Sequence, residues 1–207
     1  AMTLHDEGFR VALVDVSSIG SQESAETWYR DVLLQVATQL KTGIDFHEWW
    51  REHSHHSLPQ RMTRFFLDVV LADDHSPVVV FIDEIDSTLK LQYTDDFFTT
   101  LRSMYNQRTI EPAFERLAFC LVGVATPNEL IKDRRTTSYN IGQCIELRDF
   151  DRSRDDLSAL VRLLARSTSD GERCLNDIFS WTDGHPYLTL MLCSHVLHAQ
   201  QENAEID

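Results

Sequence analysis

The sequence predicts an α/β fold, in which helices flank a parallel sheet and a small helical appendage follows. Short apolar runs rich in β-branched residues alternate with apolar stripes at helical spacing up to about residue 150. From Asp151 onward only the helical pattern remains. We therefore expect a core over residues 1–150 and a helical subdomain over residues 151–207.

Four strands are expected in the core. A continuous run of β-branched residues is typical of a strand that is buried on both faces, as in a parallel sheet covered by helices. Such runs are bounded here by polar loops or by carboxylates. The expected strands are Arg10–Val16, Val78–Ile82, Leu117–Val124 and the short segment Cys144–Leu147.

The segments between the strands and after them have apolar residues at helical spacing. From Ala25 to Leu40 these residues form one stripe, which predicts an amphipathic helix. Thr42–Leu58 is a mixed segment that contains two tryptophans and four histidines. Further helices are expected from Pro59, over Asp95–Tyr105, Asp155–Arg166 and Glu172–Trp181, and from Pro186, because proline suits the first turn of a helix.

The segment Val78–Asp86 is the most informative part of the chain. Its five apolar residues lead directly into Asp83, Glu84 and Asp86. The carboxyl ends of strands in an open parallel sheet form the edge at which ligands bind. In P-loop NTPases the first carboxylate of such a run holds Mg²⁺ and the next activates a water molecule. The alternative is a solvated turn after a buried strand.

Five segments, in this order, resemble the AAA-like domain of bacterial signalling proteins, within the STAND class of P-loop ATPases. They are VALVDVSSIGS, PVVVFIDEIDS, LVGVATPNELI, TSYNIGQCIELRDF and WTDGHPYLTLMLC. The resemblance covers most of the chain from Arg10 to Cys193. It implies a P-loop-NTPase-like sheet, ATP and Mg²⁺ as cofactors of the complete domain, and a role as an ATP-dependent conformational switch. Such domains are usually fused to a WD-repeat, kinase or TIR module.

The resemblance implies roles for the residues at the strand ends. Asp83 becomes the Walker B aspartate associated with Mg²⁺, and Glu84 the catalytic or water-orienting carboxylate. Thr126 takes the position of the sensor of the terminal phosphate, with an ordinary strand-end cap as the alternative. Arg134 or Arg135 takes the position of a phosphate- or neighbour-sensing arginine, with solvated loop charges as the alternative.

The resemblance also gives a role to the segment before the last helix. Gly184 and Pro186 match the Gly-x-Pro signature of the lid, whose proline packs near the adenine. The same proline would simply begin a helix, and the two interpretations are compatible.

The glycine-rich phosphate loop of this family does not occur in the sequence. Such a loop needs glycine for close backbone approach and a lysine that reaches the β- and γ-phosphates. None of the three lysines, Lys41, Lys90 and Lys132, follows a glycine. In the family this loop precedes the strand that corresponds to Arg10–Val16, and we expect the chain to begin after it. We therefore expect weak or no ATP binding and no hydrolysis, with a non-catalytic interaction or scaffold domain as the alternative function.

The missing loop has a structural consequence for the sheet. In the family its strand lies between those matching Leu117–Val124 and Cys144–Leu147. Without that strand, backbone groups stay unpaired, and each costs about 1–3 kcal/mol when buried. We expect the chain to close this gap by shifting Cys144–Leu147 or to cover it by self-association.

Composition narrows the expected partners and location. The net charge of −14 and the lack of a long basic run oppose nucleic acid as the main partner, so proteins or a second copy are expected. No apolar stretch reaches about 18 residues, and the first residues do not form a signal peptide, so a cytoplasmic location without membrane contact is expected. The four cysteines are expected to be buried free thiols. The histidines of the mixed segment match no zinc spacing.

Overall fold

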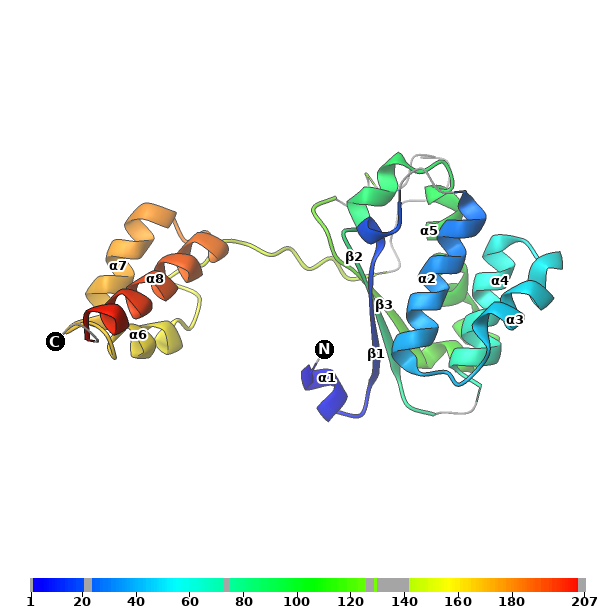
Figure 1. Cartoon of the computed structure of the whole chain (residues 1–207), viewed down its shortest axis with the longest axis horizontal. Helices are drawn as coiled ribbons and strands as arrows, with labels where there is room; N and C mark the ends of the chain where they lie inside the picture. Colours follow the sequence, from blue (N-terminus) through cyan, green and yellow to red (C-terminus); the bar gives the residue numbers. More distant parts are fainter. Residues whose placement is uncertain (1, 21–23, 73–74, 126–128, 130–141, 205–207) are drawn as a thin grey trace. The chain divides into compact units, whose positions relative to one another are not determined.

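The computed structural model describes residues 2–20, 24–72, 75–125, 129 and 142–204. Two compact units make up the chain, Ala1–Cys144 and Ile145–Asp207 (Figure 1). Each unit has a hydrophobic core of its own. The predicted α/β class, with a parallel sheet and a C-terminal helical appendage, is confirmed.

The first unit contains a parallel sheet in which β2 (Val78–Asp83) lies between β1 (Arg10–Asp15) and β3 (Leu117–Leu121). Residues Arg10, Val78 and Leu117 lie side by side in the register of the three strands. The helical elements of this unit are α1 (Met2–Asp6), η1 (Val16–Ser18), α2 (Ala25–Leu40), α3 (Phe46–Glu52), η2 (His53–His55), α4 (Leu58–Phe65), the π-helical turn η3 (Phe66–Val70), η4 (Ile85–Lys90), α5 (Thr94–Asn106), η5 (Gln107–Thr109) and η6 (Pro112–Arg116).

The longest helix of the first unit, α2, occupies the residues that its apolar stripe predicts. It begins after Ser24, whose hydroxyl oxygen accepts a hydrogen bond from the Thr27 N–H at 3.1 Å. This contact satisfies one of the free N–H groups of the first turn. The buried stripe of α2 reaches α5, where the rings of Trp28 and Phe97 meet edge to face with centroids 5.0 Å apart.

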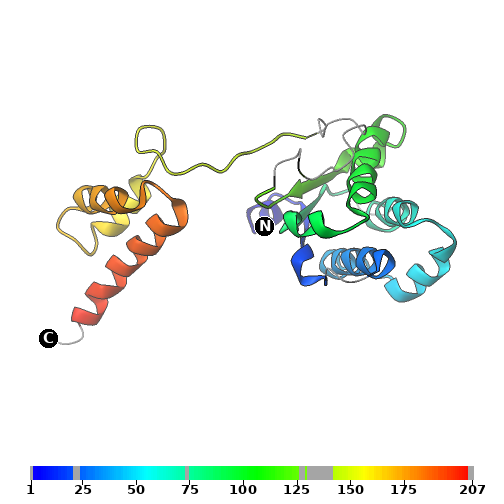
Figure 2. The same cartoon turned by 90° about the horizontal axis from the view of Figure 1, so that it is seen from above.

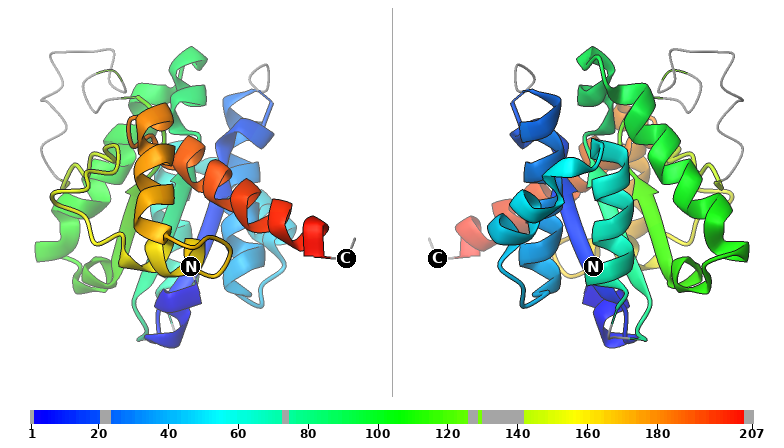
Figure 3. Two further views of the ribbon diagram at one scale, coloured as in Figure 1. Left: turned by 90° about the vertical axis from the view of Figure 1, so that its left-hand side faces the viewer. Right: turned by 90° about the vertical axis from the view of Figure 1, so that its right-hand side faces the viewer.

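One face of the sheet is buried against helices. Side chains alternate between the two faces of a strand, so Val78, Val80 and Ile82 share a face, and all three are buried. The same core includes buried residues of α2, α4 and α5. Figures 2 and 3 show these three helices on the same side of the strands. The helices α2, α4 and α5, which lie between the strands in the sequence, therefore cover this face.

A glutamine side chain closes the free edge of β1. The Leu13 N–H donates to Gln39 Oε1 at 2.8 Å, and Gln39 Nε2 donates to the Leu13 carbonyl oxygen at 2.6 Å. A single carboxamide from α2 thus makes both hydrogen bonds that a neighbouring strand would make at this residue. Since open edges template pairing with other chains, this contact protects β1.

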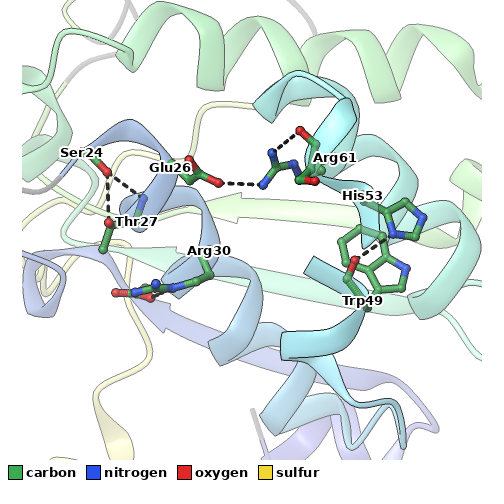
Figure 4. A network of polar contacts seen from close by, with 9 residues as sticks. Ser24, Glu26, Thr27, Arg30, Trp49, His53 and Arg61 are labelled. Carbon is green, nitrogen blue, oxygen red and sulfur yellow. Dashed lines mark hydrogen bonds and ion pairs between the residues drawn. The ribbon is translucent and has the colours of Figure 1, made fainter. Parts of the chain in front are cut away.

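A nearly buried arginine joins α2, η2 and α4 (Figure 4). Arg61 is 5% exposed; its guanidinium donates to Glu26 Oε1 at 3.1 Å and to the Ser54 carbonyl oxygen at 3.0 Å. Its central carbon lies 4.4 Å from the centre of a Trp50 ring. One carboxylate, a carbonyl group and an aromatic face together compensate for part of the lost hydration of the guanidinium, whose buried Nε has no hydrogen-bond partner among the described residues.

Three histidines gather beside this arginine, at the junction of α3 and α4. The ring of His53 stacks on Trp49 at 4.1 Å, and its Nδ1 lies 2.8 Å from the Trp49 carbonyl oxygen. The ring centres of His55 and His56 are 4.0 Å apart. Burial, and then the neighbouring His55, lowers the pKa of His56.

Two expectations about Cys144–Leu147 are wrong. The segment belongs to no strand, so it neither forms the fourth strand nor shifts to close the gap in the sheet. Ile145 and Leu147 are 76% and 91% exposed. Its apolar alternation is that of a strand, but a strand also needs a hydrogen-bonded neighbour, and no ladder forms here. The expectation that all four thiols are buried is also wrong, because Cys144 is exposed, Cys120 and Cys174 are half-buried, and Cys193 alone of the four is buried.

The second unit is a small helical bundle of α6 (Ser158–Leu164), α7 (Gly171–Thr182) and α8 (Pro186–Ala204). Its core centres on Leu164, Leu175, Ile178 and Cys193. The helix predicted to begin at Pro186 is confirmed. None of the helices in the described part of the chain has both the length and the apolar character that crossing a membrane requires.

The contact between Gln39 and β1 can be tested by its loss. Gln39→Ala removes both hydrogen bonds to Leu13, and we expect it to lower the free energy of unfolding by about 1–2 kcal/mol in urea titrations. Gln35→Ala is the matched control because it shortens the same side chain on the same helix. Equal effects of the two substitutions would show that the bonds to β1 contribute nothing.

The histidine cluster predicts a loss of stability in mild acid. Because the pKa of His56 is lowered in the folded state, the unfolded chain binds its proton more readily. The free energy of unfolding should therefore fall as the pH drops below about 6.5, the ordinary value for histidine. Urea titrations at several pH values should show a shallower fall for His56→Gln, whereas His47→Gln, at an exposed position of α3, should keep the wild-type slope.

Candidate functional site

The carboxyl end of β2 turns sharply at the two predicted carboxylates. Asp83 is the last residue of the strand, and Glu84 adopts a left-handed backbone conformation with φ 55°. The Glu84 N–H donates to Asp83 Oδ1 at 2.9 Å. A left-handed residue other than glycine costs about 1–2 kcal/mol, so the turn is held against local strain. It directs the chain into η4 and leaves the Glu84 side chain exposed.

The third carboxylate of the run, Asp86, has a structural role that the sequence does not reveal. Asp86 Oδ1 accepts a hydrogen bond from the Val124 N–H at 3.3 Å. A Cβ atom on Gly123 would lie only 2.7 Å from the same oxygen, so glycine allows the loop after β3 to come this close. Ile85 reinforces the contact by donating its N–H to the Val122 carbonyl oxygen at 3.0 Å. Asp86 thus joins the end of β3 to the turn after β2.

Asp15 at the end of β1 is a further acidic residue of this edge, and sequence reasoning missed it. The register of the strands places Asp15 beside Asp83. The Ser17 hydroxyl donates to Asp15 Oδ1 at 2.6 Å and the Ser17 N–H donates to it at 2.9 Å. The hydroxyl bond is the main reason that the pKa of Asp15 lies below its usual value. Its position at a strand end, two residues before Ser17, is the signal that could have identified it.

The edge fits a hard divalent cation better than it fits a nucleotide. Mg²⁺ binds through one or two carboxylates and several water molecules, and Asp15 and Asp83 supply two neighbouring carboxylates. Among the described residues, no group of three ligand-type side chains is arranged as a complete metal site. For the phosphates, Lys41 caps the far end of α2, and no lysine follows a glycine. Among the described residues, Asp15 and Asp83 are therefore of the ligand type that Mg²⁺ takes, and the sequence contains no phosphate loop for a triphosphate.

Three predicted site residues, Thr126, Arg134 and Arg135, lie outside the described residues. The roles expected for them as a phosphate sensor and as sensing arginines therefore stay predictions.

Gly184 lies at a tight crossing in the second unit. After α7 the chain takes left-handed conformations at Asp183 (φ 50°) and Gly184 (φ 81°) before Pro186 begins α8. The Phe150 N–H donates to the Gly184 carbonyl oxygen at 2.9 Å. A Cβ atom at Gly184 would lie 2.2 Å from the Phe150 carbonyl oxygen. Glycine is required here both by the backbone angle and by the neighbouring chain.

Hydrogen bonds hold the turn around Gly184, and two aromatic side chains next to it are exposed to solvent. The hydroxyl groups of Thr182 and Thr189 lie 2.8 Å apart and are buried between α7 and α8. The His185 N–H donates to the Thr182 carbonyl oxygen at 2.9 Å. On the surface, Trp181 is 84% and Tyr187 68% exposed. The Gly-x-Pro segment is therefore a rigid corner flanked by two exposed rings.

The crossing at Gly184 gives a testable stability difference. Gly184→Ala must place its Cβ against Phe150 in a left-handed conformation, so we expect the second unit to lose more than about 1 kcal/mol. Amide hydrogen exchange in α7 and α8 measures this loss directly. Gly142→Ala, where an added Cβ meets nothing within 4 Å, is the control and should leave exchange unchanged. Equal exchange in both variants would contradict the assigned crossing.

Comparison with known proteins agrees with the fold and with the segments quoted above. Residues 3–206 match the AAA-like domain family. An uncharacterized WD repeat-containing protein of Synechocystis sp. is 34% identical over 206 residues, which is 96% of this chain and 17% of that protein. The chain thus spans about a sixth of the length of this relative, and no solved structure matches it. The chain belongs to the AAA-like domain family.

Proposed function

We propose that the chain is part of an ATP-dependent conformational switch in signalling and that it does not itself hydrolyse ATP. The observation that carries this proposal is the turn at the end of β2. There, Asp83 lies at the ligand-binding edge of a parallel sheet and Glu84 is held in a strained conformation next to it. Membership of the AAA-like family supports the same role.

Within this proposal, the residues of the edge have separate tasks. Asp83 is the carboxylate assigned to Mg²⁺, either directly or through water, and Glu84 is the exposed carboxylate beside it. The bound metal would neutralise the negative charge that otherwise repels phosphate from this edge. Thr126, Arg134 and Arg135 are proposed to sense the phosphate or a neighbouring molecule. The Gly184–Pro186 corner is proposed as the part of the lid next to the adenine.

A second candidate function is a non-catalytic protein-interaction domain. Trp181 and Tyr187 favour it, because exposed aromatic rings at a rigid corner are typical of binding surfaces. The relative's name also records WD repeats in that protein. The two candidates differ in whether the complete domain changes when a nucleotide binds.

A measurement of Mg-ATP binding by the purified chain tests whether the chain is an active ATPase, which neither candidate function requires. Because the described edge offers no phosphate cradle, we expect calorimetry to show a dissociation constant weaker than about 1 mM and phosphate release at the background rate. The Asp83→Asn variant should give the same result. A micromolar affinity of the wild-type chain would contradict the expected lack of nucleotide binding. Loss of that affinity in Asp83→Asn would support the metal role of Asp83.

A further inference from the structure

The turn between α3 and α4 carries the histidine cluster, which consists of His53, His55 and His56. His53 and His56 are half-buried, and His55 is exposed. The ring centres of His55 and His56 lie 4.0 Å apart, and the ring centre of His53 lies 6.1 Å from that of His56. Three imidazoles therefore meet at one accessible place, and the candidate site at the end of β2 does not involve them.

Backbone carbonyl groups fix the orientation of two of these rings. His53 Nδ1 lies 2.8 Å from the Trp49 carbonyl oxygen, and His55 Nδ1 lies 3.1 Å from the Glu52 carbonyl oxygen. A carbonyl oxygen only accepts, so Nδ1 carries the hydrogen in both rings. Each Nε2 is then the atom that takes up the second proton. The protonated ring presents an Nε2–H donor for which the described residues provide no acceptor.

The groups that act on His56 are all positive or become positive in acid. Burial is the main reason for the lowered pKa of His56, and the groups that lower it further are His55, Arg64, His53 and Arg61. The chain contains 33 aspartate and glutamate residues, yet residues 53–67 contain none. The cluster is therefore a locally basic part of a strongly acidic chain.

The carboxylates of neighbouring elements do not neutralise the cluster. Glu26 of α2 pairs with Arg61 at 3.1 Å, and Asp68 of η3 pairs with Arg64 at 3.3 Å. The charged side chains of α3 are exposed and are not among the groups that shift the pKa of His56; they are Glu48, Arg51 and Glu52. Protonation in mild acid thus adds positive charges beside two arginines without adding a negative one. Such a concentration of charge attracts an anion.

An anion suits this place better than a metal ion does. Neutral imidazole is a common metal ligand, but Arg61 and Arg64 repel a cation, and the described residues include no group of three ligand-type side chains that could hold a metal. Protonated rings and the guanidinium of Arg64 are instead the charged donors that oxyanions accept. Trp49 keeps His53 in place after protonation, because the two rings stack at 4.1 Å and an aromatic face stabilises a cation (Figure 4).

We propose that the histidine cluster binds a phosphate-sized oxyanion when its imidazoles are protonated. The Nε2–H groups of His53 and His55 and the ring of His56 hold the anion, and Arg64 adds a further positive charge. Binding of the anion and of protons is linked, so the affinity rises as the pH falls through the ordinary range of histidine, about 6.5. The proposal goes beyond the nucleotide-dependent role and does not depend on it, because it uses no residue of the edge at β2.

Sulfate tests the proposal, because it stays a dianion over the whole range in which histidine titrates. An NMR titration of the full chain from about pH 5 to about pH 8 follows each imidazole in about 20 mM sodium sulfate and in sodium chloride of equal ionic strength. We expect sulfate to raise the pKa of His55 and His56 by at least about half a pH unit relative to chloride. His47, an exposed histidine of α3 outside the cluster, is the internal control and should respond alike to both salts.

Two variants identify the groups that hold the anion. His53→Gln removes one donor, so the rise that sulfate causes in the pKa of His56 should shrink at least about twofold. His47→Gln is the matched control and should keep the wild-type response. Circular dichroism at neutral pH shows that each variant is folded. The comparison of His47 with His56 within the wild type needs no variant, so it decides the question even where a substitution unfolds the chain.

Phenyl phosphate is a second probe, which distinguishes a free ion from a phosphate ester. A rise in the pKa of His56 with both probes supports a site for the oxyanion group of either source. A rise with sulfate alone supports a site for the free ion.

Two results would overturn the proposal. One is an equal response of His47 and His56 to sulfate in the wild type, because general attraction or screening would then explain the effect. The other is sulfate binding that is as strong at about pH 7.5 as at about pH 5.5, because protonated imidazoles would then not be required.

Discussion

The first unit depends on the pairing of β2 along both of its edges. Hydrogen bonds to β1 and β3 satisfy its backbone, which allows Val78, Val80 and Ile82 to be buried. Burying one such side chain stabilises the fold by about 1.5–3 kcal/mol. A strand held this way ends where polar groups begin, so Asp83 and Glu84 must lie at the edge of the sheet. The position of the candidate site is thus a consequence of how the core forms.

Local sequence patterns predict the helices of this fold well. They fail where an element depends on pairing with a distant segment. The stripe of α2 and the proline that begins α8 act within a few residues, and both helices are found as expected. Cys144–Leu147 has the alternation of a strand, but it becomes one only if another segment offers a free edge. Because no such ladder forms, the pattern alone predicts a strand that does not exist.

The same limit applies to the site. Asp83 and Glu84 are predictable because the strand and its acidic end are adjacent in the sequence. Asp15 joins them only through a register between segments almost 70 residues apart, which no local motif records. Asp86 looks like a third ligand in the sequence, yet it accepts a hydrogen bond from the loop after β3. The crossing of Gly184 with Phe150 is likewise visible only when the two segments are brought together.

The net charge of −14 bears on self-association of the first unit. Exposed apolar residues of the sheet, such as Leu13, and open strand edges would ordinarily promote self-association. Mutual repulsion between acidic chains opposes that association at long range, and Gln39 blocks one edge by direct contact.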